Sequence, residues 1–345
     1  MKIHSKKVLG LAAATLTFAL ALSGCGKGAG DDDGGSGSAD SKKLSITFIP
    51  KSLGNPYFEI SDAAGKKAVE ELGGTYAEVA PQEASPDAQA QYIDTEAQKR
   101  TSAIVISAND PEALGDSLTK AREAGTKVVT FDSDTNPEYR DLFINQANAE
   151  GIAKVQVEMI ADQIGDSGEI AILSATANAT NQNTWIGLME KELAASHPDI
   201  KLVDTVYGND DDQTSFDKTA ALLQKYPNLK GIVSPTTVGI AAAARYLSTS
   251  DKKGKVALTG LGGPNDMRKY VKDGTVTEFA LWNPGDLGTL AAHAAHALAN
   301  GDIKGEEGDT FEAGELGEFT VGKDGEVLLG DPFKFNKDNI DDFQF

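Results

Sequence analysis

From residue 44 onward, short apolar runs alternate with longer stretches in which apolar residues recur at helical spacing. This alternation is typical of strands that are each followed by a helix, and it predicts a parallel β-sheet in each of two domains. Some strands, such as residues 103–106, are apolar at every position, so we expect helices on both faces of the sheets. The predicted strands, with the helices that follow them, are Leu44–Pro50 with Tyr57–Leu72, Ala103–Ser107 with Pro111–Ala124, Lys127–Phe131, Glu169–Ser174 with Asn181–Ala195, Leu202–Tyr207 with Gln213–Lys225, Gly231–Ser234 with Gly239–Leu247, and Val256–Gly260 with Asn265–Val271.

Three residue pairs mark predicted helix starts directly after strands. Asn55-Pro56, Asp110-Pro111 and Asn283-Pro284 each place a capping side chain before a proline, whose fixed φ and missing N–H suit the first helical turn. The carboxyl ends of parallel strands meet at one edge of a sheet, and open α/β folds bind their ligands there. We therefore expect a binding site at this edge.

The pattern changes after residue 298. The segments Phe319–Val321 and Val327–Leu329 flank the turn residues Lys323-Asp324-Gly325, which predicts a terminal hairpin, followed by a tail rich in Asn and Asp. We expect a first lobe over residues 44–145 with a return at about 284–300, and a second lobe over residues 147–282. The C-terminal hairpin and tail, residues 301–345, are not assigned to either lobe.

The first 24 residues have the pattern of a secretion signal. Three lysines precede an apolar run over residues 8–22, which is too short to span a membrane comfortably. Leu22-Ser23-Gly24-Cys25 resembles the lipobox of bacterial lipoproteins, and this resemblance implies cleavage before Cys25 and acylation of that residue. The alternative is an ordinary signal that happens to end near a cysteine. Gly, Ser, Ala and Asp dominate residues 25–43, so we expect a flexible linker there.

The composition excludes several classes of function. Acidic side chains outnumber basic ones by 52 to 32, so a phosphate backbone or an anionic surface would repel the chain, and we expect no nucleic acid partner. Cys25 is the single cysteine, which rules out an intrachain disulfide and a cysteine-based metal site. The absence of a Gly-x-Ser-x-Gly turn disfavours an acyl-transfer enzyme.

Two motifs resemble cofactor or metal sites but lack an essential residue. Residues 260–265 begin like a dinucleotide fingerprint, yet Asn265 stands where the third glycine is needed for helix packing. Residues 132–136 match the start of a calcium loop, yet Pro137 and Phe143 occupy its glycine and glutamate positions. We therefore expect no nucleotide cofactor and no calcium ion.

Two further groups of polar residues are interpreted as structural. The run Asp210-Asp211-Asp212 is interpreted as a solvated surface loop, because three adjacent carboxylates cannot all face one ion. His293 and His296 lie one turn apart in an alanine-rich helix, where we expect them on a partly buried face and not on zinc. The sequence thus predicts no metal.

Polar and aromatic residues gather at the predicted strand–helix junctions of both lobes. Carboxylates and amides can pair with neighbouring hydroxyls, a lysine can donate to one, and an aromatic face can cover the C–H side of a ring. This mixture suits a neutral polyol, although abundant carboxylates leave a glycosidase open as an alternative. The candidate ligand-binding residues are Lys51, Asn55, Tyr57, Phe58, Asp132, Asp134, Asn181, Gln182, Trp185, Pro235, Thr237 and Trp282.

At these residues the sequence resembles the type I periplasmic sugar-binding proteins, the substrate-capturing components of ABC importers, over about residues 43–345. It is most similar to the rhamnose-binding group. A sister group binds the quorum signal autoinducer-2 and shares the Ile-Pro-Lys and Asp-Ser-Asp blocks. The blocks that carry the resemblance are Phe48-Ile49-Pro50-Lys51, Asn55-Pro56-Tyr57-Phe58, residues 130–135, Phe143-Ile144-Asn145-Gln146, residues 178–185, Pro235-Thr236-Thr237-Val238-Gly239 and Leu281-Trp282-Asn283-Pro284.

The resemblance implies roles for individual positions. The autoinducer-2 group typically has aspartate where this chain has Asn181 and alanine where it has Thr237, so both positions argue against that ligand. An amide in place of an acid removes a charged acceptor and supplies a donor, which changes the preferred hydroxyl pattern. The implied ligand contacts are Lys51, Asp132, Asn181, Gln182, Pro235 and Thr237, with Phe58 and Trp282 as walls of the cleft.

The same resemblance implies a fold and a mechanism. We expect two similar, doubly wound α/β lobes with parallel sheets, joined by a hinge around an interlobe cleft, as in periplasmic binding proteins of type I. A monosaccharide, with rhamnose as the best match, would shift the lobes to a closed form that delivers it to ABC permease subunits. We expect an extracytoplasmic monomer held on the cell membrane by its lipid. The alternatives are an autoinducer-2 receptor and a glycosidase that uses Asp132.

Overall fold

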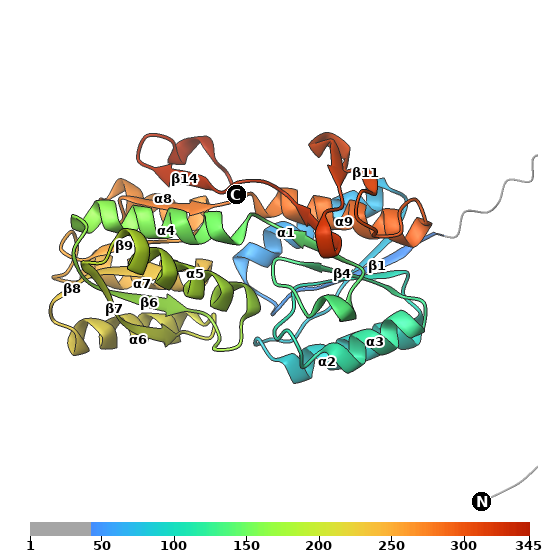
Figure 1. Ribbon diagram of the computed structural model, residues 1–345, viewed down its shortest axis with the longest axis horizontal. Coiled ribbons are helices and arrows are strands. Elements are labelled where there is room, and N and C mark those ends of the chain that lie inside the picture. Colours follow the sequence, from blue (N-terminus) through green and yellow to red (C-terminus); the bar gives the residue numbers. More distant parts are fainter. Residues whose placement is uncertain (1–42) are drawn as a thin grey trace, which may run out of the picture. The chain divides into compact units, whose positions relative to one another are not determined.

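The computed structural model describes residues 43–345 (Figure 1). In this part of the chain two open sheets of parallel strands are each covered by helices on both faces, so the predicted α/β class is confirmed. No helix among residues 43–345 combines the length and the apolar character needed to cross a membrane. The signal sequence, Cys25 and nearly all of the linker lie outside the described residues, and the expectations for them stay predictions.

The first lobe is built on a sheet with the strand order β13-β5-β4-β3-β1-β2, in which every adjacent pair is parallel. Helices α1 and α9 pack together on one face, and α2 and α3 pack on the other (Figure 1). All four residues of β3 are fully buried, which explains their continuous apolar run. The elements are β1 (Ser45–Ile49), α1 (Pro56–Glu71), β2 (Thr75–Glu78), α2 (Pro86–Lys99), β3 (Ala103–Ile106), α3 (Gly115–Glu123), β4 (Lys127–Phe131), β5 (Leu142–Asn145), α9 (Pro284–Asn300) and β13 (Glu326–Leu328).

The second lobe repeats this design on a sheet with the order β7-β6-β8-β9, again with parallel pairs. Helices α4 and α5 pack together, as do α6 and α7, and α8 packs on α7. A parallel bridge between Leu261 and Ala280 places β10 beside the end of β9. The elements are α4 (Ala149–Ile164), β6 (Gly168–Ser174), α5 (Thr180–Ser196), β7 (Ile200–Tyr207), α6 (Asp212–Lys225), β8 (Leu229–Ser234), α7 (Thr237–Thr249), β9 (Ala257–Gly260), α8 (Pro264–Lys272) and β10 (Glu278–Leu281).

Within residues 43–345 the chain passes from one lobe to the other between β5 and α4, between β10 and α9, and between β13 and β14 (Phe333–Asn336). Helix α9 thus follows a strand of the second lobe but packs against α1 and β4 of the first. Connections of this kind are the segments at which two lobes can rotate while each stays rigid.

The prediction of a terminal hairpin between residues 319–321 and 327–329 is wrong. β12 (Glu318–Thr320) pairs antiparallel with β11 (Thr310–Glu312), and β13 joins the first sheet in parallel beside β5. β14 pairs antiparallel with β10, so the C-terminal segment contributes to both lobes.

Burial explains this course of the chain. Val327 is fully buried opposite Ile144 in the first sheet, whereas an isolated two-stranded hairpin is at best marginally stable in water. The guanidinium of Arg140 donates to the carbonyl of Asp324 at 2.7 Å and holds the preceding turn against the same lobe. The turn residues therefore redirect the chain into an existing sheet, and they do not fold it back on itself.

The helix predicted to start at Pro111 begins one turn later, at Gly115. The Asp110 carboxylate caps an isolated turn by accepting from the N–H groups of Glu112 and Ala113, both at 2.8 Å. The carbonyl of Pro111 accepts from the backbone of Asn136 at 2.9 Å, so it is not available for a regular helical bond.

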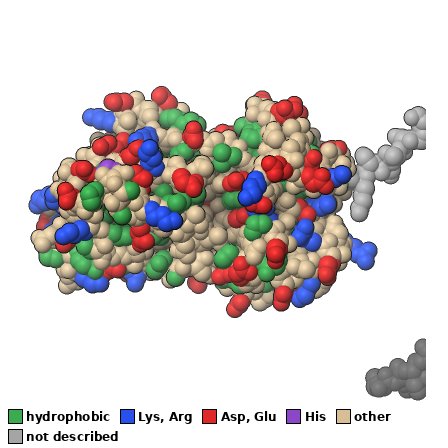
Figure 2. All heavy atoms as spheres, viewed as in Figure 1, with side chains coloured by type: hydrophobic (Ala, Val, Ile, Leu, Met, Phe, Trp, Pro, Cys, Tyr) green, Lys and Arg blue, Asp and Glu red, His purple; other side chains and the backbone are tan. Residues whose placement is uncertain are grey.

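Charged side chains of both signs are interspersed on the face of the molecule that Figure 2 shows. The formal net charge of the whole chain is −20. On this face the acidic excess is spread over both lobes and does not form one dominant patch (Figure 2). A distributed negative charge favours solubility more than the binding of one particular cation.

Helices α1 and α9 approach each other closely at Gly288. A Cβ atom added there would lie 1.9 Å from the carbonyl oxygen of Ser61, so a side chain at this position would force the helices apart. Gly65 of α1 faces the sheet instead, where an added Cβ atom would lie 2.4 Å from the ring of Phe48 in β1. The close approach at Gly288 holds α9 against the first lobe.

The same packing buries a carboxyl group in α1. Asp62 is 2% exposed, one of its oxygens accepts from the hydroxyl of Ser61 at 3.0 Å, and Oδ2 has no partner among residues 43–345. Burial, reinforced by the nearby Glu78 carboxylate, raises the pKa of Asp62 to about 8. The folded protein therefore holds a proton on Asp62 that the unfolded chain releases near pH 4.

This proton makes stability depend on pH. A raised carboxyl pKa stabilises the folded state at acidic pH, and this stabilisation is lost as the pH rises from about 4 to about 8. Asp62→Asn cannot ionise, so we expect its free energy of unfolding to gain on that of the wild type by about 1 kcal/mol for each pH unit between about pH 4 and pH 8. Below pH 4 the difference between the two proteins should not change with pH. Parallel pH dependences of the two denaturation midpoints would contradict this explanation.

Candidate functional site

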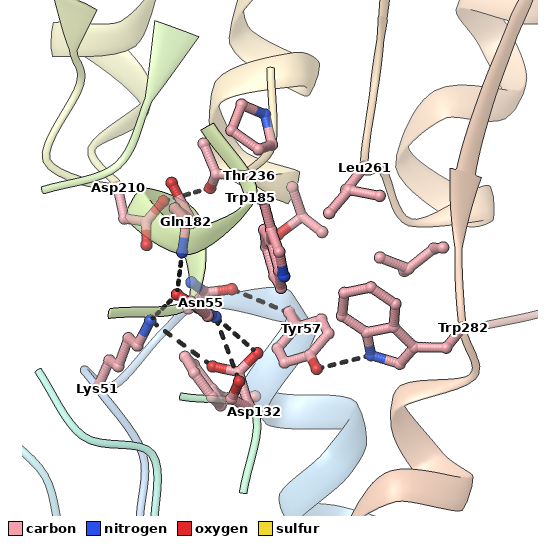
Figure 3. Close-up of a pocket in the computed structure, with 15 residues that line it drawn as sticks. Lys51, Asn55, Tyr57, Asp132, Gln182, Trp185, Asp210, Thr236, Leu261 and Trp282 are labelled. Carbon is pink, nitrogen blue, oxygen red and sulfur yellow. Dashed lines mark hydrogen bonds and ion pairs between the residues drawn. The ribbon is translucent and has the colours of Figure 1, made fainter. Parts of the chain in front are cut away.

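A pocket lies between the two lobes, at the carboxyl ends of their strands (Figure 3). This is the position expected for a ligand site in an open α/β fold. Every candidate from the sequence except Asp134 lines it. The lining residues are Lys51, Asn55, Tyr57, Phe58, Asp132, Asn181, Gln182, Trp185, Asp210, Pro235, Thr236, Thr237, Leu261, Leu281 and Trp282.

A nearly buried ion pair and an amide form the polar centre of the pocket. The ammonium of Lys51, which follows β1, lies 3.7 Å from the carboxylate of Asp132, which follows β4, and their side chains are 7% and 8% exposed. Lys51 also donates to the amide oxygen of Asn181 at 3.1 Å. Because Asn181 belongs to the second lobe, this cluster connects the lobes directly (Figure 3).

The backbone and a neighbouring hydroxyl orient Asp132. Its φ is 60°, in the left-handed region that L residues rarely adopt, and Ser107 donates to its Oδ2 at 2.7 Å. The amide nitrogen of Asn181 lies 3.4 Å from its Oδ1. Such backbone strain persists where the surrounding structure determines the conformation, often at binding sites. The carboxylate is therefore held in place before a ligand arrives.

Gln182 presents one end of its amide to the pocket. Its Oε1 accepts from the hydroxyl of Ser174 at 2.6 Å and from the N–H of Ala175 at 2.8 Å. With the oxygen engaged by the end of β6, the amide nitrogen is the atom that can serve a ligand, as a donor.

Aromatic rings form the opposite wall. Asn55 caps α1 by accepting from the N–H of Tyr57 at 3.0 Å, which places Tyr57 and Phe58 in the first turn, facing the pocket. Trp282 donates to the Tyr57 hydroxyl at 2.8 Å and meets Trp185 edge to face at 6.0 Å between ring centroids. Burial, with the Asp132 charge, raises the pKa of Tyr57 well above its usual value. Tyr57 is therefore a neutral part of this wall.

Asp134 does not line the pocket, which corrects its place among the predicted ligand-binding residues. Its carboxylate forms a two-pronged ion pair with Arg140, at 2.7 and 2.8 Å, and accepts from the hydroxyl of Thr130 at 2.5 Å. The Arg140 side chain is only 4% exposed, so it needs this partner. Asp134 is thus a structural residue of the first lobe.

Asp210 and Thr236 line the pocket but were not predicted as ligand-binding residues. The interpretation of Asp210 as part of a solvated loop is therefore wrong, whereas Asp211 caps α6 by accepting from the N–H of Thr214. Burial and the Asp132 charge raise the pKa of Asp210, although its bond from Thr236 and the Lys51 charge oppose this. The position of Asp210, three residues after the end of the predicted strand Leu202–Tyr207, was the available signal. Leu261 and Leu281, at the ends of β9 and β10, were also missed.

The histidine pair and the acidic runs do not form a metal centre in the part of the chain described. No group of three or more His, Cys, Asp or Glu side chains among residues 43–345 is placed to hold a metal ion. His293 is half-buried in α9, and burial lowers its pKa.

Comparisons with known proteins agree with this geometry. The periplasmic binding protein domain matches residues 46–303. A sugar ABC transporter protein from Actinomyces odontolyticus is 55% identical, over 90% of this chain and 100% of the other, with a TM-score of 0.71. A solute-binding protein from Clostridium phytofermentas with bound L-rhamnose is 38% identical, over 88% of this chain and 98% of the other, with a TM-score of 0.85.

A third solved structure carries the other ligand considered from the sequence. LsrB from Clostridium saccharobutylicum, in complex with AI-2, is 26% identical over 88% of this chain and 100% of the other, with a TM-score of 0.83. The relatives are binding proteins of importers and not enzymes, so the glycosidase alternative is rejected. The chain belongs to the periplasmic binding protein family of type I, as an extracytoplasmic sugar-binding protein that works with the permease of an ABC transporter.

Proposed function

We propose that this protein captures a 6-deoxyhexose, with L-rhamnose as the best candidate, and carries it to the permease while held on the cell membrane by a lipid on Cys25. The observation that carries this proposal is the two-sided pocket. Lys51, Asp132 and Asn181 supply charged and amide groups on one side, and aromatic rings with two leucines supply apolar surface on the other.

The apolar side favours a deoxy sugar over a fully hydroxylated one. Leu261, Leu281 and Trp282 are buried side chains at the ends of neighbouring strands, and all three line the pocket. A methyl group can occupy such surface without losing hydrogen bonds, whereas a hydroxymethyl group there would leave its hydroxyl without a partner. The relative that binds L-rhamnose, at 38% identity, supports the same ligand class.

The contacts between the lobes support a closing mechanism. The bond from Lys51 to Asn181 and a second bond at 3.1 Å from Asn178 to Asp110 both join the two lobes. A sugar that contacts both lobes forms its full set of contacts only in the closed form. It therefore shifts the equilibrium toward the closed form, by the difference between its affinities for the closed and open forms. The ligand leaves unchanged when the lobes separate.

A panel of sugars tests the ligand class. Titration calorimetry of the folded protein with L-rhamnose, L-fucose, L-mannose, D-ribose, D-allose and autoinducer-2 should give the tightest binding for L-rhamnose. L-mannose, which has a hydroxyl on the carbon that is a methyl in L-rhamnose, should bind at least about tenfold more weakly, because the apolar wall cannot serve that hydroxyl. Tightest binding of autoinducer-2, or no binding of any monosaccharide, would reject the proposal.

Two aspartates that lie two residues apart provide a matched pair of variants. Asp132→Asn should weaken L-rhamnose binding by about 1.5–3 kcal/mol, the range for hydrogen bonds to charged groups, and it should also lower the free energy of unfolding, because it leaves the nearly buried Lys51 ammonium without its carboxylate partner. Asp134→Asn should lower the free energy of unfolding by about 3 kcal/mol, because it breaks a buried pair with Arg140, but the folded variant should bind L-rhamnose as the wild type does. Calorimetry and denaturation of both variants check this, and equal effects of the two on binding would show that the pocket is misassigned.

The lipid anchor has its own test. Cells that express the Cys25→Ala variant should release the protein or leave it with an uncleaved signal, and metabolic labelling with a fatty acid should fail. Ser38→Ala, a change in the predicted linker, is the control and should leave the labelling intact. Incorporation of the fatty acid into Cys25→Ala would contradict the anchor.

A further inference from the structure

Asp210 brings a second carboxylate to the pocket, from the second lobe. It follows β7, and the N–H groups of Gly208 and Asn209 continue the sheet by donating to the carbonyls of Ser174 and Ala175 at 2.8 and 2.9 Å. Asn209 and Asp210 then both adopt positive φ, at 57° and 51°. This turn directs the Asp210 side chain into the pocket instead of into solvent (Figure 3).

Only one oxygen of this carboxylate is in use. The hydroxyl of Thr236 donates to Oδ1, and Oδ2 has no hydrogen-bond donor among the residues that the structure describes. Asp210 is partly buried, which raises its pKa, so its ionised form is less well solvated than in water. An acceptor in such surroundings gains from a donor that a ligand brings.

The charges around Asp210 indicate which ligands suit it. The charged residues that line the pocket are Lys51, Asp132 and Asp210, and Lys51 is already paired with Asp132. The pocket therefore carries a net negative charge when both carboxylates are ionised. The hydroxyls of a neutral polyol can donate hydrogen bonds to both carboxylates. The negative charge of a sugar acid or a sugar phosphate would be repelled by them.

We propose that Asp210 is a specificity-determining ligand residue, which accepts a hydrogen bond from one hydroxyl of a neutral sugar while Thr236 holds it in place. This inference rests on the proposed sugar-binding function and adds a contact on the second lobe. Because Asp132 stands on the first lobe and Asp210 on the second, a sugar with hydroxyls toward both carboxylates links the lobes and favours the closed form.

The neighbouring residues supply well-matched variants. Asp210→Asn keeps the shape but removes the charge, and Thr236→Val removes the hydroxyl that holds the carboxylate. Asp211→Asn is the control, because asparagine caps α6 as well as aspartate does, and Asp211 does not line the pocket. Thermal unfolding of each ligand-free variant should stay close to that of the wild type.

The binding experiment uses L-rhamnose and its 2-, 3- and 4-deoxy derivatives with the wild type and each variant. We expect Asp210→Asn to bind L-rhamnose about 10- to 100-fold more weakly, Thr236→Val to show a smaller loss in the same direction, and Asp211→Asn to stay within about twofold. One deoxy derivative, the one that lacks the hydroxyl facing Asp210, should bind the wild type and Asp210→Asn equally. The wild type and Asp210→Asn, each measured with L-rhamnose and with this derivative, form a double-mutant cycle. The cycle isolates the contact between the Asp210 side chain and that hydroxyl.

The outcomes separate this inference from the proposed function. If the wild type does not bind L-rhamnose, the proposed ligand is wrong, and the cycle is repeated with the sugar of the panel that does bind and its deoxy derivatives. If the wild type binds but Asp210→Asn has the same affinity, the inference is overturned while the function stands. An equal loss for every deoxy derivative would also overturn it, because that result indicates a structural role for Asp210.

Discussion

The binding site depends on an ion pair that is almost completely buried. The Lys51 ammonium and the Asp132 carboxylate are both nearly buried, and such charges are tolerated only when they are paired and hydrogen-bonded. Ser107 of the same lobe and Asn181 of the opposite lobe add hydrogen bonds to this pair. A contact between the lobes therefore helps to stabilise the buried charges of the pocket. In the proposed function, the hydroxyls of a sugar form hydrogen bonds with Lys51, Asp132 and Asn181.

Rigid strand ends position these groups, and unusual backbone conformations direct them. Asp132 and Asp210 each follow a strand and each have a positive φ, one in either lobe. A conformation that costs energy is retained where it places a side chain that an ordinary extension of the strand would direct elsewhere. The two lobes thus use the same device to present a carboxylate to one pocket.

Neighbouring acids of the same kind have different roles. Asp132 faces the pocket, while Asp134 neutralises the buried guanidinium of Arg140. In the acidic run that starts at Asp210, the first residue lines the pocket, Asp211 caps α6 and Asp212 pairs with Arg245 at the surface. Residue type therefore identifies what chemistry is available, and the direction of each side chain decides which of these roles it performs.

The sequence by itself determined the α/β class, most strands and helices, and the strand ends at which the site lies, because apolar periodicity and capping motifs are local properties. Tertiary structure decided the rest. It separated Asp134 from the pocket and added Asp210, Thr236, Leu261 and Leu281. It also divided residues 301–345 between the lobes, since β13 and β14 each pair with a strand distant in the sequence. These outcomes depend on the burial of partners that no local pattern encodes, which is why the sequence could not decide them.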